Sequence, residues 1–428
     1  MICKMICYVF VLVLLFFLLI RIYKGLLNAP IIVFAIFVLN FIGLLLYNGN
    51  AFFYCLGILA FVVGIYISEF FFKGYKNKIF AKKSYFSRKK ELQVTFALLL
   101  LFSFLGLLYY SKGIPVFSVN PDRVRFEQQN IPFFGFLYRI NYWTLPYLVL
   151  VFLFLCERRK KNVFCKIVFV FFLLLTFFLN VLTGSKGAII HYALLFLLYF
   201  SYMNKIKKGV HYVYLGVFCI LSFFVILKMF QINSGVNSFK EAFFIFLYRI
   251  TLGSAEGIHL IMTDFTEIFG YGFGWFSFIK PIYTFLGTLR IIEKGPLTMD
   301  TGNFIGIYYR GYDNLAPFTY TILAQGYLDF GKMGLVMYGF IFGFILHQNY
   351  IRIIRNKDNF RFVQFVTYDW LLIALASWGY IDGWITFAFI YIIFPMCLIR
   401  IFMIVLPSKI SFKVLTKERF AYENKNRL

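Results

Sequence analysis

Charged side chains are scarce in this sequence. Only 14% of its residues are Asp, Glu, Lys or Arg, whereas a soluble globular domain carries roughly 25%. Hydrophobic residues make up 61%, and apolar runs of about 20 residues, long enough to cross a bilayer, recur from end to end. The shortage of charge excludes an ordinary soluble domain and predicts an integral membrane protein.

Alternation of apolar and polar residues is also missing. Residues 9–20 read VFVLVLLFFLLI, without the period of two that marks an outer-membrane β-strand. A helix satisfies its own backbone hydrogen bonds inside a bilayer. We therefore expect an all-α polytopic integral membrane protein.

Acidic residues and paired cysteines are few. The 43 Lys and Arg outnumber the 18 Asp and Glu, but the basic residues fall in short loops between apolar runs and form no groove-reading face. The seven cysteines lie almost all within or beside apolar runs, without the spacing of a zinc site or a disulfide framework. We expect no nucleic-acid partner and no metal.

The apolar runs predict about 11 transmembrane helices, within a range of about 10 to 12. They cover residues 5–20, 30–47, 51–72, 92–111, 134–156, 167–183, 187–203, 211–230, 317–346, 362–379 and 384–406. When these are threaded alternately, 28 of the 43 Lys and Arg fall on one side. Basic loops stay in the cytoplasm, so that side is predicted to be cytoplasmic.

The same threading predicts one polytopic membrane domain over residues 1–428 with two long outer loops. These are residues 112–133 and 231–316, and a basic cytoplasmic tail follows at 407–428. Long loops usually carry function. Within the second loop, residues 242–262 are apolar but interrupted by charged and polar residues, which favours an interfacial or re-entrant helix over a further span.

The pentapeptide FLYRI occurs twice, at residues 136–140 and 246–250, and each copy places one arginine inside an apolar run. Both arginines belong to a group in the outer segments and adjoining span ends that runs against the positive-inside bias. The group is Arg123, Arg125, Arg139, Arg249, Arg290 and Arg310. Arginine grips phosphate and carboxylate through two parallel hydrogen bonds. Salt bridges with outer acids are the simple explanation for these residues, and an anion-binding site is the functional one.

The first outer loop contains the stretch NPDRVRFEQQN. If Pro121 starts a helix, Arg123 and Glu127 stand one turn apart; if the stretch is extended, Arg123, Arg125 and Glu127 share a face. Either geometry gathers positive charge beside a carboxylate. A surface ion pair and an anion clamp with Glu127 as base or organiser are both consistent with it.

At the outer end of the sixth predicted span, the sequence LTGSKGAII marks a break and a new helix start. Free N–H groups and the positive end of the helix dipole, together with Lys186, favour an anion site there. A plain helical hairpin turn explains the two glycines equally well. Glu256 and His259 have the one-turn spacing of a metal helix, but no other helix supplies the partner glutamates.

These motifs in this order resemble the bacterial polysaccharide repeat-unit polymerases of the Wzy, or O-antigen polymerase, type. The resemblance covers most of the chain and includes GIPVF at the entry to the first outer loop, the GSKG break, a large second loop, and PFTYTILAQGYLDFGKMGLVMYGFIFG at residues 317–343. In that last motif Gln325 stands where many relatives carry an acid. The triplet Asp329-Phe330-Gly331 within it is a chance match to the kinase signature.

The resemblance implies a glycosyltransferase in the bacterial cytoplasmic (inner) membrane. It would move a growing glycan from polyprenyl diphosphate onto the next carrier-linked repeat unit at the outer face, without nucleotide, cofactor or metal. The implied partners are polyprenyl-diphosphate-linked oligosaccharides as donor and acceptor, the lipid bilayer, a chain-length regulator and a flippase. A lipid-linked oligosaccharide flippase and an O-antigen-ligase-like transferase remain alternatives.

Such a transfer needs fixed positive charge on the diphosphate and a base near the acceptor hydroxyl. The expected substrate-binding residues are Arg123, Arg125, Arg139, Lys186, Arg249, Arg290 and Arg310. The candidate catalytic residues are Glu127, Glu256, His259, Asp300 and Asp313.

Overall fold

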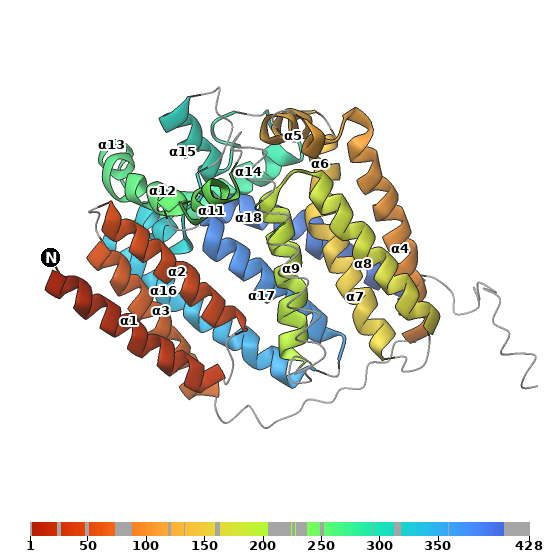
Figure 1. Ribbon diagram of the computed structural model, residues 1–428, viewed down its shortest axis with the longest axis horizontal. Coiled ribbons are helices and arrows are strands. Elements are labelled where there is room, and N and C mark those ends of the chain that lie inside the picture. Colours follow the sequence, from red (N-terminus) through yellow and green to blue (C-terminus); the bar gives the residue numbers. More distant parts are fainter. Residues whose placement is uncertain are drawn as a thin grey trace, which may run out of the picture.

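The computed structural model describes most of the chain and shows helices throughout. The described residues are 2–23, 27–47, 51–72, 88–118, 121–131, 133–158, 163–203, 224, 227, 238–248, 252–293, 295–311, 318–357 and 359–405. Within these ranges every regular element is a helix, which confirms the predicted all-α class (Figure 1).

Several helices of the first half continue directly into a helix of another type. The helices of this half are α1 (Ile2–Tyr23), α2 (Ala29–Leu46), α3 (Ala51–Phe72), α4 (Arg88–Leu108), η2 (Tyr109–Lys112), η3 (Pro115–Phe117), α5 (Pro121–Asn130), α6 (Phe134–Arg139), η4 (Ile140–Thr144), α7 (Leu145–Glu157), α8 (Val163–Leu182) and α9 (Lys186–Tyr202).

The second half begins with short helices and closes with long ones. They are α11 (Phe239–Tyr248), α12 (Ser254–Leu260), η7 (Ile261–Phe265), α13 (Thr266–Phe269), η8 (Trp275–Ile279), α14 (Lys280–Thr288), α15 (Thr301–Arg310), α16 (Ile322–Arg355), α17 (Arg361–Trp378), α18 (Ile381–Ala388), η9 (Phe389–Ile393) and α19 (Phe394–Val405).

Seven helices of the described part are long and apolar enough to cross a membrane, so the protein is a multi-pass membrane protein. They are Ala29–Leu46, Ala51–Phe72, Lys90–Phe117, Phe134–Glu157, Val163–Leu182, Ile322–Arg355 and Ile381–Phe402. Tyr8–Tyr23 and Lys186–Tyr202 are shorter apolar helices at two more of the predicted spans. The predicted span at 211–230 lies almost wholly outside the described residues. A total of about 11 therefore stays a prediction.

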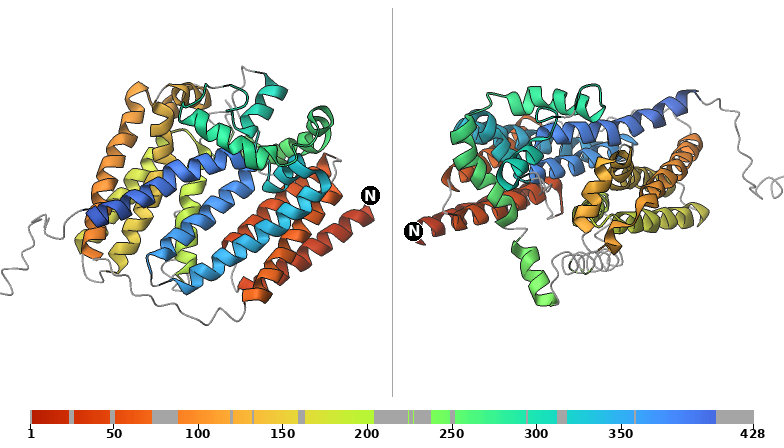
Figure 2. Two further views of the ribbon diagram at one scale, coloured as in Figure 1. Left: turned by 180° about the vertical axis from the view of Figure 1, so that it is seen from behind. Right: turned by 90° about the horizontal axis from the view of Figure 1, so that it is seen from above.

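The helices of the two predicted outer loops gather at one end of the bundle. Figure 1 shows α5, α14 and α15 above the upper ends of the long helices, with α12 and α13 beside them. The second view from behind shows the same arrangement (Figure 2). Segments far apart in the sequence thus meet at this end, where a shared site can form.

Close packing of α3 against α16 is made possible by glycines. A Cβ on Gly64 would lie 2.1 Å from the Phe340 carbonyl oxygen, and one on Gly343 would lie 2.0 Å from that of Phe61. Small residues let helix backbones approach closely in membranes, where helix packing is driven by van der Waals contact. The GFIFG stretch at 339–343 therefore forms a seam with α3.

The helix α16 turns back on itself, which differs from the continuous span expected over 317–346. Gly331 has φ of 62° and ψ of −145°, a conformation suited to glycine, and Phe330 before it is also non-helical. A Cβ on Gly326 would lie 2.4 Å from the carbonyl oxygen of Gly334, so the arm 322–329 lies directly against the start of 332–355. The fold-back is possible because Gly326 and Gly334 have no side chains, which allows the two arms of α16 to touch.

The helix at the centre of the fold leads directly to the end where the loops meet. Within the helical segment Phe134–Glu157, 94% of an apolar stretch of 18 residues is buried inside the protein. Asn141 donates to the Gly106 carbonyl at 3.0 Å, and Asn180 donates to the Asn141 carbonyl at 3.0 Å. These buried amides tie α4 and α8 to the central helix and fix the position of Arg139.

Candidate functional site

Arg139 lies at the end of α6 and is half-buried. Its guanidinium stacks on the Phe387 ring of α18, with Cζ 3.7 Å from the ring centroid. Among the described residues no carboxylate lies within ion-pair distance of it. An arginine held on an aromatic face without a counter-charge is ready to bind an anion.

Tyr380 is the residue around which the candidate charges meet. It precedes α18, is 7% exposed, and stacks on Trp378 with ring centroids 6.0 Å apart. Asp300, Arg139 and Asp382 all interact with it electrostatically. Asp300 belongs to the second outer loop, Arg139 ends α6 directly after the first outer loop, and Asp382 belongs to α18, so the fold brings these three segments to one place.

Asp382 anchors the second outer loop to the bundle. Its Oδ2 accepts from the Thr301 backbone N–H at 2.8 Å, from the Thr301 hydroxyl at 3.0 Å and from the Thr284 hydroxyl at 3.4 Å. The side chain is fully buried, and its Oδ1 has no hydrogen-bond partner among the described residues. Asp382 therefore holds the middle of α14 and the start of α15, while its Oδ1 has no partner among the described residues.

Lys280 places a second cation in the same region. It is only 3% exposed, and its Nζ lies 4.9 Å from the Phe304 ring centroid and 5.5 Å from that of Phe276. Burial lowers the pKa of the Lys280 ammonium, and the carboxylates of Asp382 and Asp300 oppose that shift. Within the described ranges the Lys280 ammonium forms no ion pair, so the carboxylates of Asp382 and Asp300 balance its charge only at longer range.

Asp300 is the sequence-predicted acid that reaches this region. It caps the N-terminus of α15, where Oδ1 accepts from the Asn303 backbone N–H at 2.9 Å and Oδ2 from the Asn303 side chain at 2.7 Å. It is half-buried, unlike Asp382, and interacts with both Lys280 and Tyr380. Of the predicted bases in the described part, Asp300 is the one that interacts with Lys280.

A buried network around Asp329 holds the segment that carries Lys280. Its Oδ1 accepts from the Phe276 N–H at 3.0 Å, and its Oδ2 accepts from the Ser277 hydroxyl and, at 3.2 Å, from Tyr338. Gln325 donates to the same Oδ2 at 3.4 Å and accepts from the Tyr320 hydroxyl at 2.9 Å. The triplet matched the kinase signature by chance, yet its aspartate positions η8 directly before Lys280.

Arg125 and Lys186 lie where the first outer loop contacts the break between α8 and α9. Arg125 donates to the Gly184 carbonyl at 3.2 Å and interacts electrostatically with Tyr142, which in turn lies 6.0 Å from Tyr138 between ring centroids. Lys186 is the first residue of α9, after the N-cap Ser185. The predicted helix break is present, and α5 packs over it.

Two of the predicted arginines form ion pairs. Pro121 starts α5, so the helical alternative holds, and Arg123 Nε lies 2.8 Å from Glu127 Oε1 with side chains 76% and 56% exposed. Arg310 lies 3.3 Å from Glu256 and stacks on Phe318 at 3.7 Å. These pairs correspond to the simple salt-bridge explanation.

The remaining predicted residues do not meet at Tyr380. His259 stacks on Tyr47, with ring centroids 5.5 Å apart, and Arg290 is exposed in the turn after α14 with φ of 57°. Arg249 and Asp313 lie outside the described residues. In the part of the chain that the structure describes, no three His, Cys, Asp or Glu side chains gather as a metal site.

The sequence reasoning missed Lys280, Asp382 and Tyr380. The signal that identified Arg139, a charge inside an apolar run, was also present in FSFIKPIY and YIDGWITF. Those two runs do not repeat one another, so no repetition marks their charged residues. A buried ionisable residue in a membrane protein is a functional candidate in its own right.

A second polar network lies toward the opposite ends of α3 and α16. Asn349 donates to Asp369 at 2.6 Å, and Tyr202 donates to the other oxygen of the same carboxylate. His347 lies 2.9 Å from Glu69 and accepts or donates a hydrogen bond with Tyr23 at 2.8 Å. Asp369 and His347 are fully buried, so this network ties helices together.

The comparison with protein families agrees with the resemblance. A family model described as "Putative O-antigen polymerase" matches residues 4–382, which is most of the chain. The chain belongs to the O-antigen polymerase family. No curated protein and no solved structure matches it. Membership indicates a membrane enzyme that polymerises repeat units in surface polysaccharide synthesis.

Proposed function

We propose that this protein transfers a growing glycan from its polyprenyl diphosphate carrier onto the next carrier-linked repeat unit. The reaction would take place at the outer face of the cytoplasmic membrane, where the two outer loops meet around Tyr380. Family membership supports polymerisation as the task, and the arrangement of charges supports this chemistry for it.

The observation that carries the proposal is the uncompensated charge of Arg139. Its planar fork is fixed by the Phe387 ring at 3.7 Å, and no described carboxylate neutralises it. A diphosphate is the counter-ion that such a group binds well, because phosphate oxygens accept parallel hydrogen bonds from guanidinium. By contrast, Arg123 and Arg310 already have carboxylate partners.

In the proposed transfer, the bond between the sugar anomeric carbon and the diphosphate oxygen breaks, and the acceptor hydroxyl oxygen bonds to that carbon. Arg139 stabilises the negative charge on the leaving diphosphate, and Lys280 adds positive potential from the buried side. The Asp300 carboxylate takes the hydroxyl proton. The loops align the two substrates, which lowers the entropic cost of the reaction.

A flippase and a ligase are the competing functions. A flippase needs charges that its substrate reaches in both halves of the membrane, whereas the second network, with Asp369 and His347, is fully buried. A ligase would use the same donor chemistry with a different acceptor. The proposed partners, a chain-length regulator and a flippase, follow from polymerisation at the outer face.

The test is replacement of Arg139 by Ala and by Lys in cells that make the surface glycan. We expect Arg139→Ala to lower the transfer rate roughly a hundredfold and leave single repeat units on a gel ladder, because one fixed donor to the transition state is lost. Arg139→Lys should recover little, since a point charge cannot replace the fork. Lys112→Ala, an exposed residue at the same end, is the control.

An unchanged ladder for Arg139→Ala, with normal protein level in the membrane, would refute the assignment. Accumulation of unflipped carrier-linked units inside the cell would instead assign transport. Replacement of Arg249, which lies outside the described residues, by Ala is expected to shorten the ladder in the same way.

A further inference from the structure

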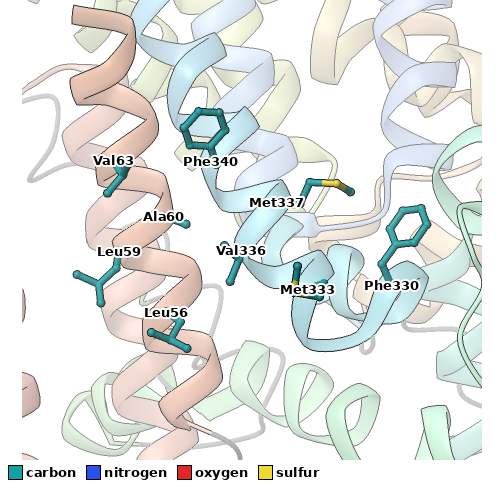
Figure 3. A pocket seen from close by; sticks show the side chains of 9 residues that line it. All are labelled: Leu56, Leu59, Ala60, Val63, Phe330, Met333, Val336, Met337 and Phe340. Carbon is teal, nitrogen blue, oxygen red and sulfur yellow. The ribbon is translucent and has the colours of Figure 1, made fainter. Parts of the chain in front are cut away.

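An apolar groove lies between α3 and α16. It has a volume of about 730 Å³ and is lined by Leu56, Leu59, Ala60, Val63, Phe330, Met333, Val336, Met337 and Phe340. Figure 3 shows the α3 side chains facing those of α16 along the groove, with Phe330 at the turn between the two arms. Every lining side chain is apolar, so only a hydrocarbon segment fits it.

A cation stands at one end of this groove. Lys332 follows the turn directly and is exposed, and its Nζ lies 4.3 Å from the ring centroid of Phe53. Phe53 precedes Leu56 by one helical turn on α3, which places the ammonium beyond the first lining residues. Among the described residues Lys332 has no ion-pair partner. An apolar groove that ends at a free ammonium complements a lipid with an anionic head.

The groove is also continuous with the candidate site. Phe330 reaches Gly274, where an added Cβ would lie 3.3 Å from its ring, and Gly274 caps η8. The neighbouring Asp329 holds η8 through Phe276 at 3.0 Å, and the Lys280 ammonium stands over the Phe276 ring. The turn before Lys332 therefore contacts η8, the helix that directly precedes Lys280.

We propose that this groove binds the polyprenyl chain of one carrier-linked substrate and that Lys332 binds its diphosphate. The polymerisation reaction uses two carrier-linked substrates, and the groove with Lys332 supplies an anchor separate from Arg139. The inference rests on the proposed polyprenyl-diphosphate chemistry.

Recognition of this lipid depends on shape and charge. Membrane lipid tails are as apolar as the groove, so burial of hydrocarbon alone gives no preference for a polyprenyl chain over a phospholipid. Close van der Waals contact and the Lys332 ammonium must supply the preference for the polyprenyl lipid. Met333 and Met337 are flexible and fill irregular gaps, which suits a branched chain.

The test measures retention of undecaprenyl diphosphate, without glycan, by the full-length protein in nanodiscs that also contain phosphatidylglycerol. Native mass spectrometry counts the bound lipid. We expect Val336→Trp, which fills the groove, and Lys332→Ala each to weaken retention roughly tenfold, the second by loss of a charge-assisted contact. Val170→Trp is the matched control, because Val170 is an exposed apolar residue on α8, outside the groove.

Three outcomes would overturn the inference. Equal retention by Val336→Trp and wild type would place the lipid elsewhere, and equal retention of phosphatidylglycerol would make the groove a site for bulk lipid. A change of oligomeric state in Val336→Trp would make it a contact between two copies. If Val336→Trp fails to insert, Met337→Trp and Lys332→Ala decide in its place.

The outcomes for the groove and for the proposed function are separable. Loss of lipid retention in the groove variants, together with an unchanged glycan ladder for Arg139→Ala, would support lipid binding in the groove and refute the role of Arg139 in transfer. The reverse pattern would support the transferase assignment and refute the groove.

Discussion

Lys280 and Asp382 differ from Arg123 and Glu127 mainly in exposure. The first two are 3% and 0% exposed, whereas the side chains of the second pair are 76% and 56% exposed. Water screens the exposed pair, so its contribution to stability is small. Water screens the interaction between Lys280 and Asp382 less, so removal of the carboxylate leaves the buried ammonium with less compensation. Equal formal charges thus have unequal consequences here.

Asp382→Ala is expected to lower the free energy of unfolding by on the order of 3 kcal/mol, because Thr301 loses its hydrogen-bond partner and the buried Lys280 loses a nearby compensating carboxylate. The double variant with Lys280→Met should be about 1 kcal/mol more stable than the sum of the single variants predicts. Thermal unfolding of the detergent-solubilised protein measures both. Strictly additive effects would show that Lys280 and Asp382 do not interact.

Glu127→Gln is expected to change stability by about 0 to 1 kcal/mol, because its ion pair with Arg123 is exposed. The same unfolding assay applies, and the chain-length ladder shows whether Glu127 also acts in catalysis. A shortened ladder without loss of stability would return Glu127 to the catalytic candidates. An unchanged ladder would leave Asp300 as the favoured base.

The helix pair α3 and α16 depends on backbone contact. Gly57 and Gly64 face Gly339 and Gly343 across a seam that has no room for side chains. The turn at Gly331 contributes to the same packing. It directs residues 332–355 along α3, while residues 322–329 fold back against the start of 332–355. The seam therefore positions the groove, Lys332 and the Asp329 network together.

Gly64→Ala is expected to destabilise the protein by about 1 to 3 kcal/mol, since the new methyl group overlaps the Phe340 carbonyl. Gly253→Ala is the matched control, because nothing lies within 4 Å of a Cβ there. The thermal unfolding midpoint in detergent reports the difference. Equal midpoints for the two variants would mean that α3 and α16 are not packed through this seam.

The assembled molecule has the helices of both predicted outer loops at one end, and in the described part Arg352, Arg355 and Arg361 lie at the opposite end, where α16 ends and α17 begins. This arrangement agrees with the threading of basic loops, but the orientation in the membrane is itself a prediction. Arg123 and Arg290 mark the loop end, while Lys357 lies at the opposite end of α16. These positions allow a direct test of sidedness.

Arg123→Cys and Arg290→Cys are expected to react with a membrane-impermeant maleimide in intact cells. Lys357→Cys should react only after permeabilisation. The parent protein provides the background, because Cys55, Cys156 and Cys165 are buried and Cys397 is exposed. Labelling of Lys357→Cys in intact cells would reverse the topology and place the candidate site in the cytoplasm.

The helical class and the approximate position of most long helices followed from hydrophobicity, because the cost of unpaired backbone in lipid leaves few alternatives. Arg139 and Asp300 were also predicted, from charge in an apolar setting and from the resemblance, and their roles stay predictions. The fold-back at Gly331 was not, because the pattern of hydrophobicity is the same for a straight and a folded helix. Lys280, Asp382 and Tyr380 meet through packing of distant segments, which local pattern does not encode.

The fold-back also constrains how the protein is made. Residues 318–329 lean on α3, where Tyr54 bonds Thr321 at 2.8 Å, and on α17, where the Trp378 carbonyl accepts from the Tyr320 N–H at 3.3 Å. The ribosome has completed α3 long before this segment and has not yet begun α17. The segment can therefore complete its packing only after α17 has emerged, so a chain truncated before α17 would hold this arm by its contact with α3 alone.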